Sequence, residues 1–135
     1  MSTQKVAVWD IFEFSAQGPE DGNPFMDVSF AAQFKLGNRT VDVPGFYDGE
    51  GTYRVRFCPD TQGEWTFTTV SDAAALNAQS GSISVTPARD GVHGPVRVRN
   101  RFHFAHADGT AYKPFGTTCY AWTHQTEAMQ EETLE

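Results

Sequence analysis

The stretch 46–67 constrains the fold of this chain more than any other part of its sequence. Residues 48–51 contain two glycines and suit a tight turn, after which apolar and charged residues alternate through 52–57. A period of two places neighbouring side chains on opposite faces of a strand. A second turn at 59–63 is followed by the same alternation. The stretch therefore predicts an antiparallel hairpin with one buried face, formed by Tyr53, Val55, Phe57, Trp65 and Phe67.

Short apolar runs bounded by turn residues recur through the first hundred residues, and we expect strands at 6–14, 25–34, 39–43 and 82–86. Both faces of the first run are apolar, which predicts a strand between two layers. In the second run the expected inward residues are Met26, Val28, Phe30, Ala32 and Phe34. Pro44-Gly45 is expected to break the third run. This spacing predicts an all-β fold, an immunoglobulin-like antiparallel β-sandwich over residues 1–100.

Two smaller local features can also be predicted. Asp72 is expected to cap a single helical turn that ends at Leu76. The cysteines, Cys58 and Cys119, are expected to be small buried thiols, because cytosolic chains rarely hold disulfides.

Residues 101–135 show a different pattern. Asp108-Gly109 predicts the turn of a short hairpin. The nearly continuous apolar run 114–122 is typical of a buried parallel strand, and 126–135 predicts the opening of a helix. A buried strand followed by a helix is how a (β/α) barrel begins. We therefore expect a second unit at 101–135, consisting of a lead-in hairpin, a first strand and a first helix of a truncated barrel.

Charge and hydropathy exclude several classes of partner. The formal net charge of −7 argues against nucleic acid and anionic membranes, since both require a basic face. No apolar run approaches the roughly 20 residues that span a bilayer. Residues 1–5 lack the layout of a secretion signal, so a cytoplasmic location is expected. The four histidines lack paired zinc spacing, and we expect no metal and no cofactor.

Several short motifs occur in a familiar order along the chain: Asn23-Pro24-Phe25, the run 43–49, Tyr53-Arg54-Val55-Arg56-Phe57, Pro59, Gly63-Glu64-Trp65-Thr66 and Gly94-Pro95-Val96. In these motifs the chain resembles the β-sandwich domain, of unassigned function, at the N-terminus of certain bacterial glycoside hydrolases. An apiosidase-like catalytic (β/α)8 barrel follows that domain, and 102–125 is similar to the lead-in hairpin and first strand of the barrel. The resemblance says little about the substrate.

The resemblance also implies where the chemistry lies. Barrel glycosidases carry their two catalytic carboxylates on later strands, about 5 Å apart in retaining and roughly 6.5–9.5 Å apart in inverting enzymes. With one barrel strand that geometry cannot be built. We therefore expect no catalytic residue and no activity in this chain alone, while the parent protein would be a glycoside hydrolase.

Three residues are candidates for substrate binding in the intact parent: Tyr120, Trp122 and His124. At period two along the predicted strand they would project in one direction, toward the active-site mouth of a barrel. Aromatic faces stack on sugar rings, and a histidine can bond a hydroxyl. In this chain alone the alternative is that they pack on the sandwich or on a neighbouring chain. An exposed surface of Phe115, Tyr120 and Trp122 would favour self-association.

Two other groups of residues have a structural interpretation that we favour. Asp48 and Glu50 could act as an acid–base pair only in a cleft, whereas a turn requires such residues for backbone reasons. Trp9, Trp65, Tyr47 and Tyr53 could form a sugar-stacking platform, but their alternation with polar neighbours indicates a core.

The sequence leaves three hypotheses for function. The first is a non-catalytic accessory domain that braces the catalytic barrel of the same polypeptide. The second is a carbohydrate-binding module, and the third is a protein–protein interaction module.

Overall fold

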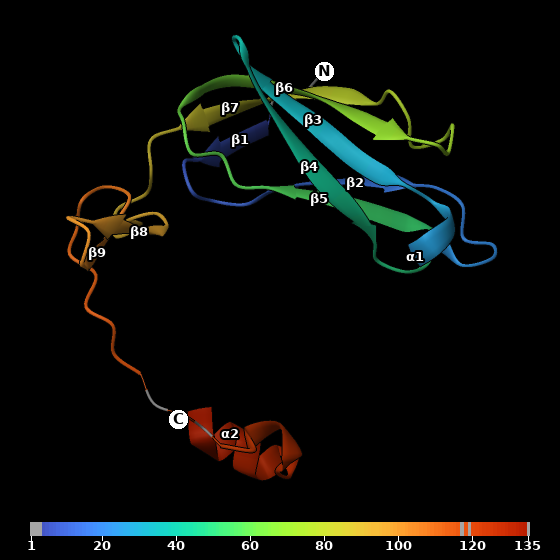
Figure 1. The fold of residues 1–135 in the computed structure, drawn as a ribbon. Helices are drawn as coiled ribbons and strands as arrows, with labels where there is room; N and C mark the ends of the chain where they lie inside the picture. Colours follow the sequence, from blue (N-terminus) through green and yellow to red (C-terminus); the bar gives the residue numbers. More distant parts are fainter. Residues whose placement is uncertain (1–3, 117, 119, 135) are drawn as a thin grey trace.

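The computed structural model describes residues 4–116, 118 and 120–134, which form a mostly β protein (Figure 1). Seven strands form one mixed sheet, nearly closed into a barrel, in the order β1-β7-β6-β3-β4-β5-β2, and β8 pairs with β9 in a separate hairpin. The strands are β1 (Gln4–Ala7), β2 (Phe12–Gln17), β3 (Phe30–Leu36), β4 (Arg39–Tyr47), β5 (Thr52–Phe57), β6 (Gly63–Ser71), β7 (Ser80–Thr86), β8 (Val96–Arg99) and β9 (His103–His106). The helices are α1 (Pro24–Asp27), a 3-10 helix (Trp122–His124) and α2 (Glu127–Leu134).

Strand β4 belongs to both layers of this sheet. Its first part pairs with β3 as far as Pro44, and its last part, from Gly45 to Tyr47, pairs with β5. A Cβ on Gly45 would lie 2.4 Å from the ring of Phe30 and 2.9 Å from the carbonyl oxygen of Arg54, so only glycine fits this crossing. The prediction that Pro44-Gly45 ends the strand is therefore wrong: at this point the strand passes from one layer to the other.

The predicted strand 6–14 is two strands at opposite edges of the sheet. Trp9 has a φ of 68°, a left-handed conformation that interrupts an extended chain. Its N–H donates to the carbonyl of Pro59 at 2.8 Å, and the N–H of Val8 donates to that of Thr86 at 2.9 Å. Before the break β1 pairs parallel to β7, and after it β2 pairs antiparallel to β5. The parallel pair of β1 and β7 makes the sheet mixed, whereas the sequence predicts a purely antiparallel sandwich.

The hairpin predicted at 46–67 has the expected buried face but a different pairing. Tyr53, Val55, Phe57, Trp65 and Phe67 are all buried. However, β5 pairs with β4 and β2, while β6 pairs with β3 and β7. The turn before Gly63 therefore carries the chain from one layer to the other. The rings of Phe57 and Trp65 meet across the core, with centroids 5.0 Å apart.

The core lies between these layers and consists largely of aromatic rings. Phe34 on β3 is fully buried and stacks on Phe57 of β5 at a centroid distance of 4.0 Å. The polar atoms of buried rings have partners: Trp65 donates from Nε1 to the carbonyl of Thr61 at 2.9 Å, and the Tyr53 hydroxyl donates to that of Pro19 at 2.8 Å. These bonds satisfy the polar atoms that burial removes from water.

Three local predictions fail for reasons visible in the structure. Met26 is 81% exposed because α1 occupies the start of the predicted second strand. Asp72 accepts a hydrogen bond from the N–H of Ser29, 3.0 Å away, and does not cap the turn at 73–77. Cys58 is exposed, and Cys119 lies outside the described residues.

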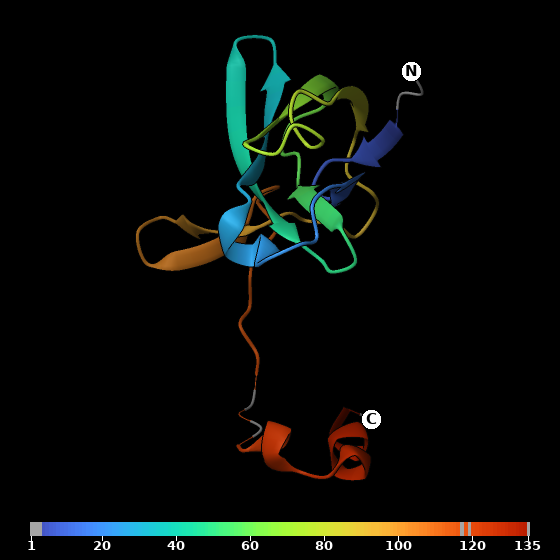
Figure 2. The same cartoon turned by 90° about the vertical axis from the view of Figure 1, so that its right-hand side faces the viewer.

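The C-terminal part of the chain leaves the sheet through the β8–β9 hairpin and runs away from it to α2 (Figures 1 and 2). We call the segment from Val96 to Leu134 the arm, and the part up to Thr86 the body. The predicted turn at Asp108-Gly109 is present, closed by a bridge between Ala105 and Ala111. Helix α2 confirms the predicted helix.

The predicted strand 114–122 is absent from the described residues of that run, since 120–121 form a turn and Trp122 begins the 3-10 helix. No helix in the described part of the chain is long and apolar enough to cross a membrane.

Candidate functional site: a cavity at the root of the arm

The three residues predicted to bind substrate do not share the face of a strand. Trp122 and His124 belong to the 3-10 helix, and Ala121 before them has a φ of 56°. Tyr120 and His124 are exposed, whereas Trp122 is half-buried and donates from Nε1 to the carbonyl of Gln130 at 3.2 Å. The alternation that would point all three in one direction is therefore absent. Their role in binding substrate stays a prediction.

The four aromatic residues that could form a sugar-stacking platform divide into two groups by burial. Trp65 and Tyr53 are completely buried, as the interpretation as core predicts. Tyr47 is half-buried and packs edge-on against Phe25, with ring centroids 5.1 Å apart. Trp9 is also half-buried, but it lies at the surface between the body and the arm, where it lines several hollows.

Asp48 and Glu50 lie in the turn between β4 and β5, where Glu50 has a φ of 48°. The Asp48 carboxylate pairs with Nε of Arg54 at 2.5 Å, and Arg54 also pairs with Glu13 on β2. Hydrogen bonds from Arg56 and Arg54 lower the pKa of Glu13. This arrangement is an ion-pair network on the exposed face of the sheet rather than an acid–base pair in a cleft.

A cavity of about 690 Å³ lies between the body and the root of the arm. The body contributes Trp9, Cys58 and Asp60 to it. The other wall comes from the segment after β7 and from the β8–β9 hairpin, namely Gly91, Val92, His93, Gly94, Pro95, Arg97 and His106. The sequence offered no motif for this site, because its residues come from four separate segments.

The indole of Trp9 packs closely against Gly94. A Cβ on Gly94 would lie 2.5–2.8 Å from three atoms of the indole, and Gly94 has a φ of 75°, so the position requires glycine on both counts. Gly94, which belongs to the motif Gly94-Pro95-Val96, therefore holds the segment that precedes the arm against Trp9 of the body.

Two histidines of the cavity wall are held by hydrogen bonds at Nδ1. Nδ1 of His93 lies 2.7 Å from the carboxylate of Asp108, and Nδ1 of His106 lies 2.9 Å from the carbonyl of Gly94. The ring centroids are 5.5 Å apart. A hydrogen bond from the N–H of Thr110 and the contact with His93 lower the pKa of Asp108 to about 2. These contacts fix the rings and leave Nε2 as the second nitrogen of each.

The charged groups of the cavity differ in how they are paired. Asp60 receives two hydrogen bonds from Arg39, at 2.6 and 2.8 Å, and this pairing lowers the pKa of Asp60 to about 2. Within the described part of the chain, the guanidinium of Arg97 has no hydrogen-bond or ion-pair partner. The unpaired charge at the cavity wall is therefore positive.

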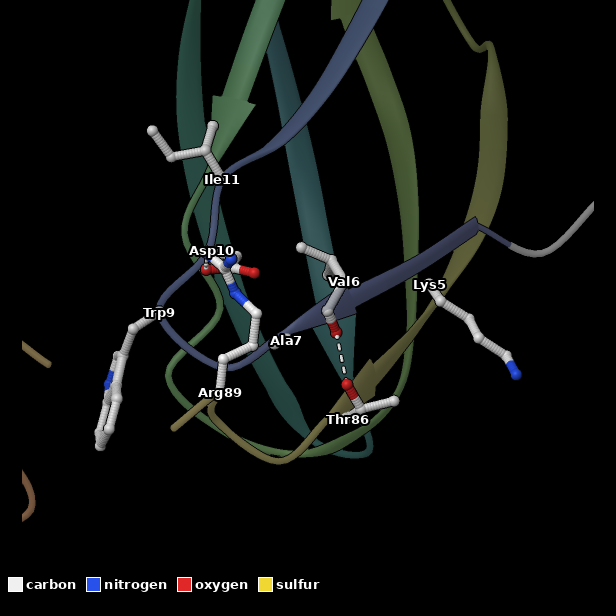
Figure 3. Close-up of a pocket in the computed structure, with 8 residues that line it drawn as sticks. All are labelled: Lys5, Val6, Ala7, Trp9, Asp10, Ile11, Thr86 and Arg89. Atoms are coloured by element: carbon white, nitrogen blue, oxygen red, sulfur yellow. Dashed lines mark hydrogen bonds and ion pairs between the residues drawn. The ribbon is translucent and has the colours of Figure 1, made fainter. Parts of the chain in front are cut away.

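A second, more open hollow of about 800 Å³ runs along β1 on the other side of the Trp9 turn (Figure 3). Arg89 pairs there with Asp10 at 2.7 Å, and the hydroxyl of Thr86 donates to the carbonyl of Val6. Its polar groups are thus largely paired with one another. Across residues 4–116, 118 and 120–134 no group of three or more His, Cys, Asp or Glu side chains could hold a metal ion.

Among the residues that the structure describes, the arm carries most of the exposed large apolar side chains. Phe102 is 86% exposed, Tyr120 is 90% exposed and Phe115 is completely exposed. We call the exposed residues Val98, Phe102, Phe104, Phe115 and Tyr120 the apolar arm surface. It lies beyond the cavity, toward the tip of the hairpin and along the extended segment.

Comparison with known proteins identifies a similar solved structure and a matching protein family. It matches a crystal structure described as that of a putative glycoside hydrolase from Bacteroides vulgatus ATCC 8482, with 48% sequence identity and a TM-score of 0.90. The match covers 98% of this chain but only 26% of that one, at its N-terminal part, so the larger protein contains further domains. No curated protein matches the chain. Residues 5–72 match the domain of unknown function DUF5060, and the chain therefore belongs to the DUF5060 family.

Proposed function

We propose that this chain is a non-catalytic accessory domain of a glycoside hydrolase, which packs on the catalytic domain of the same polypeptide through its apolar arm surface. The observation that carries the proposal is the match over 98% of this chain to about a quarter of a larger chain with that description. In this proposal residues 1–100 form an immunoglobulin-like accessory unit, and 101–135 lead into a catalytic barrel.

The distribution of exposed apolar side chains supports docking through the arm. Exposed apolar patches mark interaction sites in soluble proteins, and the five exposed apolar residues of this surface all lie on the arm. Removing one Phe side chain from water contributes about 1.5–3 kcal/mol, so covering Phe102 and Phe115 alone would stabilise an interface substantially. Tyr120, Trp122 and His124 follow on the same segment, and in the intact protein we expect them to contact substrate or the catalytic domain.

The test uses the longer polypeptide that contains this chain. Phe102→Ser and Phe115→Ser should lower its melting temperature and make the arm sensitive to proteases, because each removes a side chain from the proposed interface. Val70→Ser is the matched control, since Val70 is an exposed apolar residue of the body. In the 135-residue chain alone all three variants should melt close to wild type. If the two arm variants affect the longer polypeptide no more than Val70→Ser does, the docking role is wrong.

A further inference from the structure

The cavity at the root of the arm has the size and composition of a ligand site. Small-molecule sites enclose roughly 300–1,000 Å³ and combine apolar walls with a few convergent polar groups. This cavity measures about 690 Å³ and has Trp9, Val92 and Pro95 among its apolar lining residues. Neither the packing of the core nor the docking of the arm surface requires it.

Trp9 adds an observation that packing alone does not explain. A bulky residue with positive φ is a genuine conformational outlier, and such strain concentrates at functional positions. Here the strained turn holds the half-buried indole at the edge of the core, where it lines both the hollow along β1 (Figure 3) and the cavity at the root of the arm. The ring is fixed in place by Gly94, so it presents a preorganised apolar surface to the cavity.

The cavity also contains an arginine with no partner. The four arginines that precede β8 each form an ion pair with a carboxylate: Arg39, Arg54, Arg56 and Arg89. Arg97 forms none with the described residues, although it lies on a chain with a net charge of −7. The one acid among the lining residues, Asp60, is already bonded by both terminal nitrogens of Arg39. A free guanidinium is a donor fork that matches a carboxylate.

From these features we propose that the cavity binds a carboxylate-bearing saccharide, such as a uronic acid residue of an oligosaccharide. The carboxylate pairs with Arg97, an apolar face of the sugar lies against Trp9, and hydroxyls reach Nε2 of His93 or His106. The choice of a saccharide rests on the proposed function, since a glycoside hydrolase meets saccharides. The site is separate from the apolar arm surface, which lies farther along the arm.

The test is calorimetric titration of the 135-residue chain with trisaccharides of galacturonate and of glucuronate. The neutral trisaccharides of galactose and glucose are the matched ligands. The acidic ligands should bind with a dissociation constant of about 1 mM or lower, and the neutral ones at least about tenfold more weakly, since they lack the charged group that bonds the guanidinium.

Two arginine variants decide whether binding occurs in this cavity. Arg97→Met should weaken binding of the acidic sugar at least about tenfold, because it removes the charged donor and keeps the length of the side chain. Arg101→Met is the matched control, because Arg101 is also an exposed, unpaired arginine of the hairpin but does not line the cavity. Equal losses in the two variants would indicate general charge attraction and overturn the proposal, as would the absence of saturable binding.

A titration with a hexaglutamate peptide tests the other source of carboxylates, an acidic protein surface. If the peptide binds as tightly as the acidic sugars and loses the same factor in Arg97→Met, the saccharide assignment is wrong. All of these measurements are made without a catalytic domain. A negative result therefore leaves the docking of the arm untouched, and a failure of docking leaves the binding site untouched.

Discussion

The body and the arm contain the same kinds of aromatic side chain, but those of the body are largely buried and those of the arm are largely exposed. In the body, Phe34 and Trp65 are completely buried, because two layers of one sheet face each other across them. In the arm, Phe102 and Phe115 are exposed, because a two-stranded hairpin and an extended segment have no second layer. Aromatic content therefore predicts a core only where the topology provides an opposite face. The exposed rings on this single layer are the observation behind the proposed docking of the arm.

The largest expected effect distinguishes a buried from an exposed phenylalanine. Phe34→Ala should destabilise the 135-residue chain by about 3–5 kcal/mol, because it leaves a cavity between β3 and β5. Phe115→Ala should change its stability by less than about 0.5 kcal/mol, as exposed substitutions usually do. Urea unfolding followed by fluorescence measures both. A comparable loss in the two variants would mean that the arm packs on the body in solution.

A smaller effect is expected from adding one methyl group at a glycine of each region. Gly45→Ala should cost about 1–3 kcal/mol, because the new Cβ would lie against Phe30 and the carbonyl of Arg54 where β4 changes layers. Gly116→Ala should stay within about 0.5 kcal/mol of wild type, since nothing lies within 4 Å of its Cβ position. Thermal unfolding of the two variants provides the comparison. A neutral Gly45→Ala would show that the crossing can relax.

The smallest effect concerns two aspartates that share a pKa of about 2. Asp60 on the body is paired with Arg39, and Asp108 on the arm bonds Thr110 and His93. The folded pKa of Asp60 lies below the unfolded value of about 3.9. Its contribution to stability is therefore present above pH 4 and is lost as the pH falls toward 2.

Unfolding curves at several pH values between 6 and 2 test this difference. The stability gap between wild type and Asp60→Asn should shrink across the window from about pH 4 to about 2. Asp108→Asn should leave the global unfolding of the body unchanged at every pH and loosen only the hydrogen bonds between 93 and 110, which amide exchange detects. A gap for Asp60→Asn that does not depend on pH would contradict the assignment of the ion pair with Arg39.

Local patterns in the sequence predicted which side chains are buried, but they did not predict which strands pair. The alternation around Val55 and Trp65 placed both side chains correctly in the core, because the face on which a strand residue lies depends only on its neighbours along the chain. The pairing of β5 and β6 with other strands depends on which layer each joins, and no local signal encodes that. The break at Trp9 was also missed, because neither glycine nor proline marks it.

The cavity could not have been predicted for a related reason. Trp9, Asp60 and Arg97 are distant in sequence, and each is unremarkable where it stands. The prediction that Tyr120, Trp122 and His124 bind substrate assumed a regular strand, which the described residues do not form. Their role in binding substrate stays a prediction.

The pairing of β1 with β7 has a consequence for how the chain folds. Val6 on β1 lies opposite Val85 on β7, so the partner of the first strand lies nearly eighty residues later in the sequence. Contacts this distant in sequence require closure of a long loop and slow the search for the native state. We therefore expect the N-terminal strand to be added late in refolding, after the antiparallel strands β3 to β6 have assembled. Strand β1 would then be among the last strands to form its hydrogen bonds.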